Sequence, residues 1–184
     1  MTNTMGDYRG SIGKLYVKPI VDLKTAMEVL DKCMESIIDN PNNLSFIRNL
    51  DKDYIRSFVK DVVLNNNQYD YRIIGFYSQS ADELVGCCLL SYGYPWYSDK
   101  QRILNEEWTV SFKRGAGIAR ALSDYLIDCL KNDECDYIQT GSVNDWCAPM
   151  LKNSYVSKGF HIYNCYYLSK EDINGNIQEN QWSL

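Results

Sequence analysis

The segment WTVSFKRGAGIARAL, residues 108–122, constrains the fold more than any other part of the sequence. A run typical of a strand leads directly into Gly115, Ala116 and Gly117, and a pattern typical of an amphipathic helix follows. Glycines at such a junction let the backbone turn sharply and bring several N–H groups close to a ligand. Those donors lie at a helix N-terminus, which favours a phosphate group, and Arg114 can add a charge-assisted bond. A plain glycine-containing turn is the alternative interpretation.

Two well-known phosphate-binding loops do not match this segment. The sequence has no G-x-x-x-x-G-K-[ST] pattern, which excludes a P-loop nucleotidase. The pair of glycines at 115 and 117 lacks the third glycine of the dinucleotide fingerprint. If the loop binds a phosphate, it therefore does so in another kind of fold.

The rest of the chain predicts a mixed α/β layer fold with one sheet. Strand, helix and turn signals alternate along the sequence in the order β-α-α-β-β-β-α-β-α-β. The middle strands are joined by short turns, so we expect an antiparallel meander there. In the second helix Tyr54 is placed on the apolar face, and Gly159 is predicted to end the last helix. The predicted strands are residues 14–21, 71–79, 83–94, 102–112, 135–143 and 160–169, and the helices begin near Asp22, Asp51, Gly117 and Met150.

A length of 184 residues fits one domain, which we place at residues 13–170. Residues 1–12 carry few apolar anchors and are expected to fray, whereas residues 171–184 form a polar C-terminal extension in which a final strand is one option. Apolar runs are far shorter than the roughly 18–20 residues that a bilayer span needs, so no membrane span is expected.

Charge and cysteine content narrow the classes of function. Lys and Arg total 19 against 24 Asp and Glu, a formal net charge of −5, which argues against general nucleic-acid binding. Seven cysteines without a C-x-x-C pair are typical of reduced, buried thiols in a cytoplasmic protein. The single histidine, His161, excludes a histidine-rich metal site, so no metal is predicted.

The pattern Arg114-x-x-Gly117-x-Ala119, between a strand and a helix, resembles the acyl-CoA pyrophosphate loop of the GNAT superfamily of N-acetyltransferases. The element order from about residue 13 to 170 is similar to that family's order. The segment from Tyr155 to Phe160 also resembles the family's later Tyr-x-x-x-Gly-Phe motif. Two motifs in the right order make the resemblance stronger than one loop would.

The resemblance implies acetyl-CoA as the cofactor, bound where the predicted strands 102–112 and 135–143 splay apart. Backbone groups near Trp108 and Val110 are expected to pair with pantetheine and to polarise the thioester carbonyl. Asn144 is expected to bond pantetheine or a relayed water. The pyrophosphate is expected on the backbone amides of the loop, which are those of Gly115, Ala116, Gly117, Ile118 and Ala119.

In such a fold the amine attacks the thioester directly, a base or a chain of waters removes its proton, and an acid protonates the leaving thiolate. Tyr155 matches the tyrosine that serves as the acid, although a tyrosine in the core is the alternative. Glu106 and Glu107 are candidates for the base, and strand alternation sends them to opposite faces. Glu106 shares its parity with Trp108 and Val110 and is preferred, while solvated strand residues are the alternative for both.

The sequence constrains the identity of the acceptor amine less than it constrains the cofactor. Tyr94, Trp96 and Tyr97 could wall an amine pocket through cation–π contacts, or pack under the meander or cover a sheet edge. An acidic chain suits an amine-bearing small molecule or the lysine or N-terminus of a protein, and a homodimer is a further expectation. Two other classes stay open: a catalytically silent GNAT-fold interaction module, and an enzyme that modifies nucleic acid.

Overall fold

The computed structural model describes residues 6–10, 13–37, 50–65, 70–141 and 148–161. In this part of the chain a six-stranded sheet follows the chain order, and its first five strands pair antiparallel with their neighbours. The last pair, β5 with β6, is parallel. The strands are β1 (Gly6–Gly10), β2 (Gly13–Pro19), β3 (Tyr71–Ser78), β4 (Glu83–Gly93), β5 (Ile103–Ser111) and β6 (Tyr137–Gln139).

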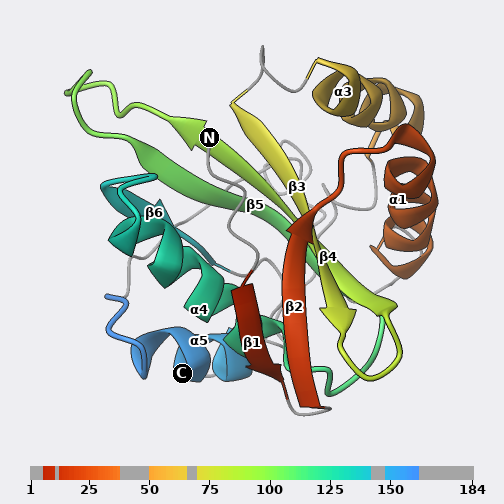
Figure 1. The fold of residues 1–184 in the computed structure, drawn as a ribbon. Coiled ribbons are helices and arrows are strands. Elements are labelled where there is room, and N and C mark those ends of the chain that lie inside the picture. The colour runs from red at the N-terminus through yellow and green to blue at the C-terminus, as the bar shows by residue number, and fades with distance from the viewer. Residues whose placement is uncertain (1–5, 11–12, 38–49, 66–69, 142–147, 162–184) are drawn as a thin grey trace, which may run out of the picture.

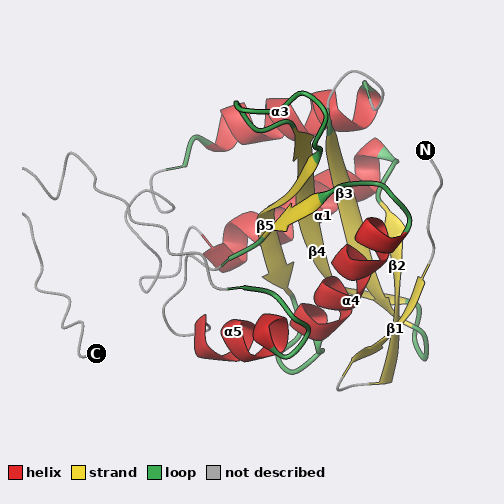
Figure 2. Ribbon diagram, turned by 90° about the vertical axis from the view of Figure 1, so that its left-hand side faces the viewer, coloured by secondary structure: helices red, strands yellow, loops and turns green. Residues whose placement is uncertain are grey.

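Two pairs of helices cover the two faces of this sheet. Helices α1 (Leu23–Ile37) and α3 (Lys52–Leu64) lie on one face, and α4 (Ile118–Lys131) and α5 (Ala148–Val156) lie on the other (Figures 1 and 2). Polar side chains fix where the first two helices begin. The Asp22 carboxylate accepts a 2.8 Å bond from the Thr25 N–H, and the Asp51 carboxylate accepts bonds from the N–H groups of Asp53 and Tyr54.

Strand alternation divides the core into two layers. Ile74 and Cys88 face α4, whereas their neighbours Ile73 and Cys87 face α1 and α3. The α4 layer is completed by the buried face of that helix, where Leu122 is fully buried. Burying one such side chain stabilises the fold by about 1.5–3 kcal/mol. The meander and the α4 helix predicted from the sequence are therefore confirmed.

A polar cluster anchors the C-terminal end of α4 to the sheet. The Arg72 guanidinium donates to the Tyr125 hydroxyl at 2.9 Å and to the Glu134 carboxylate at 3.0 Å, and the Tyr92 hydroxyl donates to the same carboxylate. The Arg102 guanidinium lies 4.4 Å from the centre of the Tyr92 ring. The helix is thus fixed at the end opposite the glycine loop, residues 114–117.

Two expectations from the sequence are corrected. Residues 6–10 were expected to fray, yet they form β1, paired antiparallel with β2 from Gly6↔Val17 to Gly10↔Gly13. Ladder bonds join backbone groups, so this pairing does not depend on apolar anchors. Tyr54 is 68% exposed, because Val59 and Val62 form the buried face of α3.

Some predictions concern residues outside the described part of the chain. The expected strand at residues 160–169 and the extension at 171–184 fall largely in residues 162–184, so the domain boundaries at 13 and 170 stay predictions. Five cysteines in the described part are buried free thiols, as expected: Cys33, Cys87, Cys88, Cys129 and Cys135. None of the described helices combines the length and apolar character that a bilayer crossing requires.

Candidate functional site

The parallel strands β5 and β6 part after a short ladder. They pair only at Ile103↔Tyr137, Leu104↔Ile138 and Asn105↔Gln139. Beyond Asn105, β5 continues to Ser111, and within the described ranges no strand pairs with it on the side away from β4. The predicted splay between these two strands is confirmed, and it lies on the side of the ladder toward the glycine loop that follows β5.

Side chains from three elements meet where the strands part. Glu106 is the first residue of β5 beyond the ladder, and Thr140 directly follows β6. The Thr140 hydroxyl donates to Oε2 of Glu106, and the Tyr155 hydroxyl of α5 donates to the same oxygen at 2.7 Å. One carboxylate therefore joins β5, the end of β6 and α5. We call the gap between β5 and β6 the opening, and its closed end is the point beyond Asn105↔Gln139 where the ladder stops.

Tyr155 is held in its protonated form. Its side chain is buried and packs against Phe160, with ring centres 5.1 Å apart. Burial raises the pKa of Tyr155 above its ordinary value, and the negative charge of Glu106 raises it further. Tyr155 is thus a core tyrosine, and its hydroxyl also contacts a carboxylate at the splay. Such a group keeps its proton at neutral pH and has it available to donate.

A β-bulge in β5 corrects the predicted facing of Glu106. Leu89 of β4 pairs with Trp108, but the next residue, Leu90, pairs with Glu106, so Glu107 is an extra residue without a counterpart. Val110 packs with α1 and α3, whereas Glu106 faces Tyr155 on the other side of the sheet. The prediction that Glu106 shares a face with Trp108 and Val110 is wrong, because simple alternation fails across a bulge.

Glu107 points to the face opposite Glu106, as alternation between these neighbours predicts. Its carboxylate is exposed and accepts a hydrogen bond from the hydroxyl of Ser91, a buried residue of β4. Ser91 in turn accepts a 3.2 Å bond from the Asn105 side-chain amide. This network holds Glu107 on the face of the sheet that α1 and α3 cover.

The glycine loop has the backbone conformation that its sequence indicates. Gly115 has a φ of 74° and Gly117 a φ of 81°, both in the left-handed region that favours glycine. Gly117 is the N-cap of α4 and has no side chain to cap the helix. The first N–H groups of α4 are therefore left for another acceptor. A Cβ built on Gly115 meets no atom within 4 Å, so open space lies beside the loop.

The flanking residues shape this loop and give it positive charge. Ala116 and Ile118 are buried, which fixes the loop and the first turn of α4 against the sheet, and Ala119 is half-buried. Arg114 and Arg120 are exposed. A helix N-terminus with uncapped donors, beside two guanidinium groups, favours an anion such as a phosphate.

Comparisons with known proteins agree with this geometry. No protein-family model matches the sequence, and no curated protein sequence matches it either. Solved structures do match. A predicted acetyltransferase from Clostridium acetobutylicum, solved with acetyl-CoA, is 14% identical with a TM-score of 0.58, covering 85% of this chain and 96% of its own. This chain has the GNAT acetyltransferase fold.

Two further structures with this fold act on different amines by their descriptions. An aminoglycoside 6'-N-acetyltransferase from Acinetobacter baumannii is 14% identical, with a TM-score of 0.56 and coverage of 85% of this chain and 97% of its own. A ribosomal-protein-alanine N-acetyltransferase from Brucella melitensis biovar Abortus is also 14% identical, with a TM-score of 0.56 and coverage of 84% and 98%. At such identities the likeness shows the fold that this chain shares with them.

Not every predicted residue lies beside this opening of the GNAT fold. Tyr94, Trp96 and Tyr97 are 60%, 95% and 64% exposed in the loop before β5, so they do not pack under the meander. That loop precedes β5, whereas the glycine loop follows it. Asn144 lies outside the described residues.

Sequence reasoning missed several polar residues near the opening. Thr140 follows a short strand and belongs to no sequence motif. Extending the β5–β6 register by one position beyond Asn105↔Gln139 would have placed Thr140 opposite Glu106. Thr109 has a buried hydroxyl, which is the one buried side-chain polar atom in the described chain without a hydrogen-bond partner. The described residues contain no group of His, Cys, Asp and Glu that could hold a metal ion.

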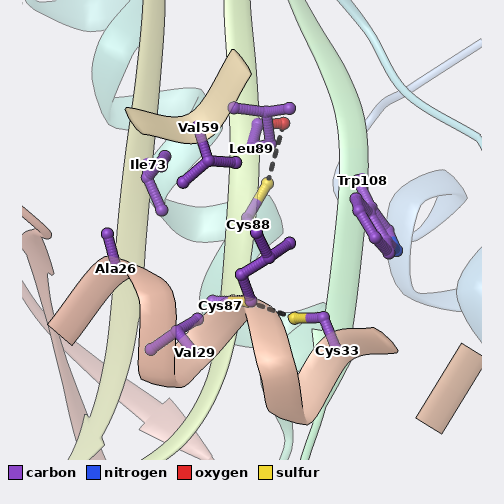
Figure 3. Close-up of a pocket in the computed structure, with 10 residues that line it drawn as sticks. Ala26, Val29, Cys33, Val59, Ile73, Cys87, Cys88, Leu89 and Trp108 are labelled. Carbon is purple, nitrogen blue, oxygen red and sulfur yellow. Dashed lines mark hydrogen bonds between the residues drawn. The ribbon is translucent and has the colours of Figure 1, made fainter. Parts of the chain in front are cut away.

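An apolar cavity of about 40 Å³ lies on the Glu107 face of the GNAT sheet (Figure 3). Trp108 and Leu89 border it from the sheet, and Val29 borders it from α1. The thiols of Cys33 and Cys87 are 3.3 Å apart at its edge. This cavity is too small for a cofactor.

Proposed function

We propose that this protein is an N-acetyltransferase that moves the acetyl group of acetyl-CoA to a primary amine. The observation that carries the proposal is the opening between β5 and β6. Tyr155 and Glu106 meet at its closed end, and the glycine-capped N-terminus of α4 follows its open end. The solved structure of the same fold with acetyl-CoA supports this cofactor.

The residues around the opening fit acetyl-CoA. The pyrophosphate needs N–H donors and positive charge, which the amides of Gly115 and Gly117–Ala119 and the Arg114 guanidinium can supply. The Ala116 N–H already donates to the Lys113 carbonyl at 3.2 Å. Pantetheine needs backbone partners, which the edge of β5 away from β4 can offer at Thr109, between Trp108 and Val110. The carbonyl of Val110 itself points toward Gly86 of β4. The Thr109 hydroxyl adds a polar group that is otherwise unsatisfied. Asn144 keeps its proposed role as a pantetheine or water ligand.

When bound, acetyl-CoA supplies a thioester, whose C–S bond breaks as a C–N bond to the amine forms. The amine must lose a proton during transfer. We propose that the Glu107 carboxylate accepts this proton, with Glu106 as the alternative base. The bulge places Glu107 on the face of the sheet shared by Trp108 and Val110. Its exposed carboxylate, positioned by Ser91, can accept a proton and pass it to solvent.

Tyr155 supplies the proton that the departing sulfur requires. The Tyr155 hydroxyl is protonated at neutral pH, so a proton is present at the closed end of the opening when the thiolate leaves. Glu106 and Thr140 hold this hydroxyl at the closed end of the opening. The two carboxylates thus differ in role, since one positions the acid and the other removes the amine proton.

We propose a small cationic amine as the acceptor. The net charge of −5 suits a positively charged molecule, and one structure with this fold is described as an aminoglycoside acetyltransferase. The exposed rings of Tyr94, Trp96 and Tyr97 stay a proposed amine-binding surface, although their loop precedes β5 and the glycine loop follows it. A protein N-terminus or lysine is the alternative, since another is described as a ribosomal-protein-alanine acetyltransferase. A homodimer and a cytoplasmic location remain predictions.

The test is release of free CoA thiol from acetyl-CoA in the presence of primary amines. A panel of spermidine, kanamycin and a lysine-containing peptide covers the proposed acceptor classes. We expect thiol release that depends on one of these amines, together with the mass of one added acetyl group on it. Binding of acetyl-CoA without turnover of any amine supports the silent interaction module instead.

A further inference from the structure

We propose that Glu106 restricts the acyl donor to uncharged acyl groups and excludes donors whose acyl chain ends in a carboxylate, such as a malonyl group. This inference rests on the proposed function, because it places an acyl-CoA in the opening between β5 and β6. Glu106 then acts on the choice of donor, separately from the transfer of protons.

The Glu106 carboxylate lies where the acyl group of a bound donor would end. A donor held by the glycine loop at the open end extends its acyl group toward the closed end. Glu106 is the first residue beyond the last ladder pair, Asn105↔Gln139, so its carboxylate lies where the opening closes. A second carboxylate at the end of an acyl chain would come close to it.

The hydrogen bonds of Glu106 keep it in place. The hydroxyls of Thr140 and Tyr155 both donate to its Oε2. An ionised carboxylate is an acceptor-only group and suits two donors on one oxygen. Because one donor follows β6 and the other lies on α5, Glu106 cannot turn away from the opening without losing bonds to both elements.

Within the described ranges, no Lys or Arg side chain forms an ion pair with Glu106 that could compensate a second negative charge. Leu104 and Cys88, on the same face as Glu106, are fully buried. Burial raises the pKa of the Cys88 thiol, and the negative charges of Glu106 and Glu107 raise it further. Lys158, three residues after Tyr155, is already paired with Asp124 of α4. Two like charges brought together in a partly buried site repel strongly.

The experiment compares two donors of equal carbon number in the acyl group, propionyl-CoA and malonyl-CoA, with acetyl-CoA as reference. Calorimetric titration of the full chain at neutral pH gives the three dissociation constants without any acceptor. We expect propionyl-CoA to bind at least about tenfold more tightly than malonyl-CoA. In Glu106→Gln, which keeps an oxygen acceptor for both hydroxyls, the ratio should fall to within about threefold, while Glu107→Gln should keep it at tenfold or more.

Three results overturn the inference. Equal binding of propionyl-CoA and malonyl-CoA to the unaltered chain does so without any variant, so the test survives a variant that fails to fold. A ratio unchanged in Glu106→Gln removes Glu106 as the cause. Binding of acetyl-CoA alone means that size, not charge, selects the donor. Absence of binding by every CoA species is a different result, because it contradicts the proposed function itself.

Discussion

The Tyr155 hydroxyl donates a 2.7 Å hydrogen bond to the Glu106 carboxylate at the point where β5 and β6 part. This contact joins two residues 49 positions apart in the sequence. It also explains why the pKa of Tyr155 is raised, since the hydroxyl is buried and lies beside a negative charge.

Replacing Tyr155 with Phe should lower the rate of acetyl transfer more than it lowers cofactor binding. Loss of a general acid typically costs about 10²–10⁴-fold in rate. We expect kcat to fall at least about tenfold, with the dissociation constant of acetyl-CoA changed by less than about threefold. Stopped thiol-release assays and calorimetry measure the two quantities. An unchanged kcat would mean that another group or water protonates the thiolate. Tyr54→Phe, at an exposed position of α3, is the control and should change neither.

Replacing Glu107 with Gln should lower kcat/KM for the amine, because Gln cannot accept the proton. A decrease of at least about tenfold is expected, without loss of acetyl-CoA affinity. Ser91→Ala removes the hydroxyl that positions Glu107 and should lower kcat/KM in the same direction by a smaller factor. Glu28→Gln on the exposed face of α1 serves as the matched control. Full activity in Glu107→Gln would return the role of base to Glu106.

Replacing Gly86 with Ala should destabilise the protein and weaken cofactor binding. A Cβ at Gly86 lies 2.6 Å from the Val110 carbonyl oxygen and 2.9 Å from a terminal carbon of Ile118, the first residue of α4. Relief of this clash must move β5 or α4, at a cost of about 1–3 kcal/mol. Chemical denaturation measures the loss. Gly93→Ala, where a Cβ meets nothing within 4 Å, should change the stability by less than about 0.5 kcal/mol. Similar effects of both substitutions would contradict the close approach of β4 to α4.

The buried cysteines should react slowly with alkylating reagents. A hydrogen bond with Cys33 and burial raise the pKa of Cys87 well above its ordinary value, and burial raises that of Cys129 to about 12. The thiolate is the reactive form, and its fraction falls tenfold for each unit by which the pKa rises above the pH. We expect alkylation of both at least about tenfold slower than in the unfolded chain, measured by peptide mass spectrometry. Equal rates in the two states would show that these thiols are accessible.

Local signals in the sequence predicted the parts of the site that depend on local conformation. Gly117 was placed at the start of α4 and has the left-handed φ that such a junction requires. Gly159 was placed at the end of α5, has a φ of 93°, and is followed by the Phe160 N–H bond to the Tyr155 carbonyl. At both positions the left-handed backbone favours glycine over other residue types, so the glycine itself indicates the local conformation.

Features that depend on strand partners could not be predicted from the sequence. The bulge at Glu107 arises from the pairing of β5 with β4, so counting residues along β5 assigned Glu106 to the wrong face. Thr140 acquires its role from lying opposite Glu106 where two strands separate. The strand β1 depends on its ladder with β2. Each of these requires knowledge of which strand lies next to which.

The most direct test of the account is a calorimetric titration of acetyl-CoA into the full chain and into Gly117→Glu. The carboxylate would lie at the N-terminus of α4, where the pyrophosphate is proposed to bind, and would repel it. Gly159→Glu adds the same side chain at another left-handed glycine and controls for backbone strain. The account predicts saturable binding to the unaltered chain and to Gly159→Glu, with loss of binding in Gly117→Glu. Absence of binding to the unaltered chain, or equal affinity in Gly117→Glu, would contradict it.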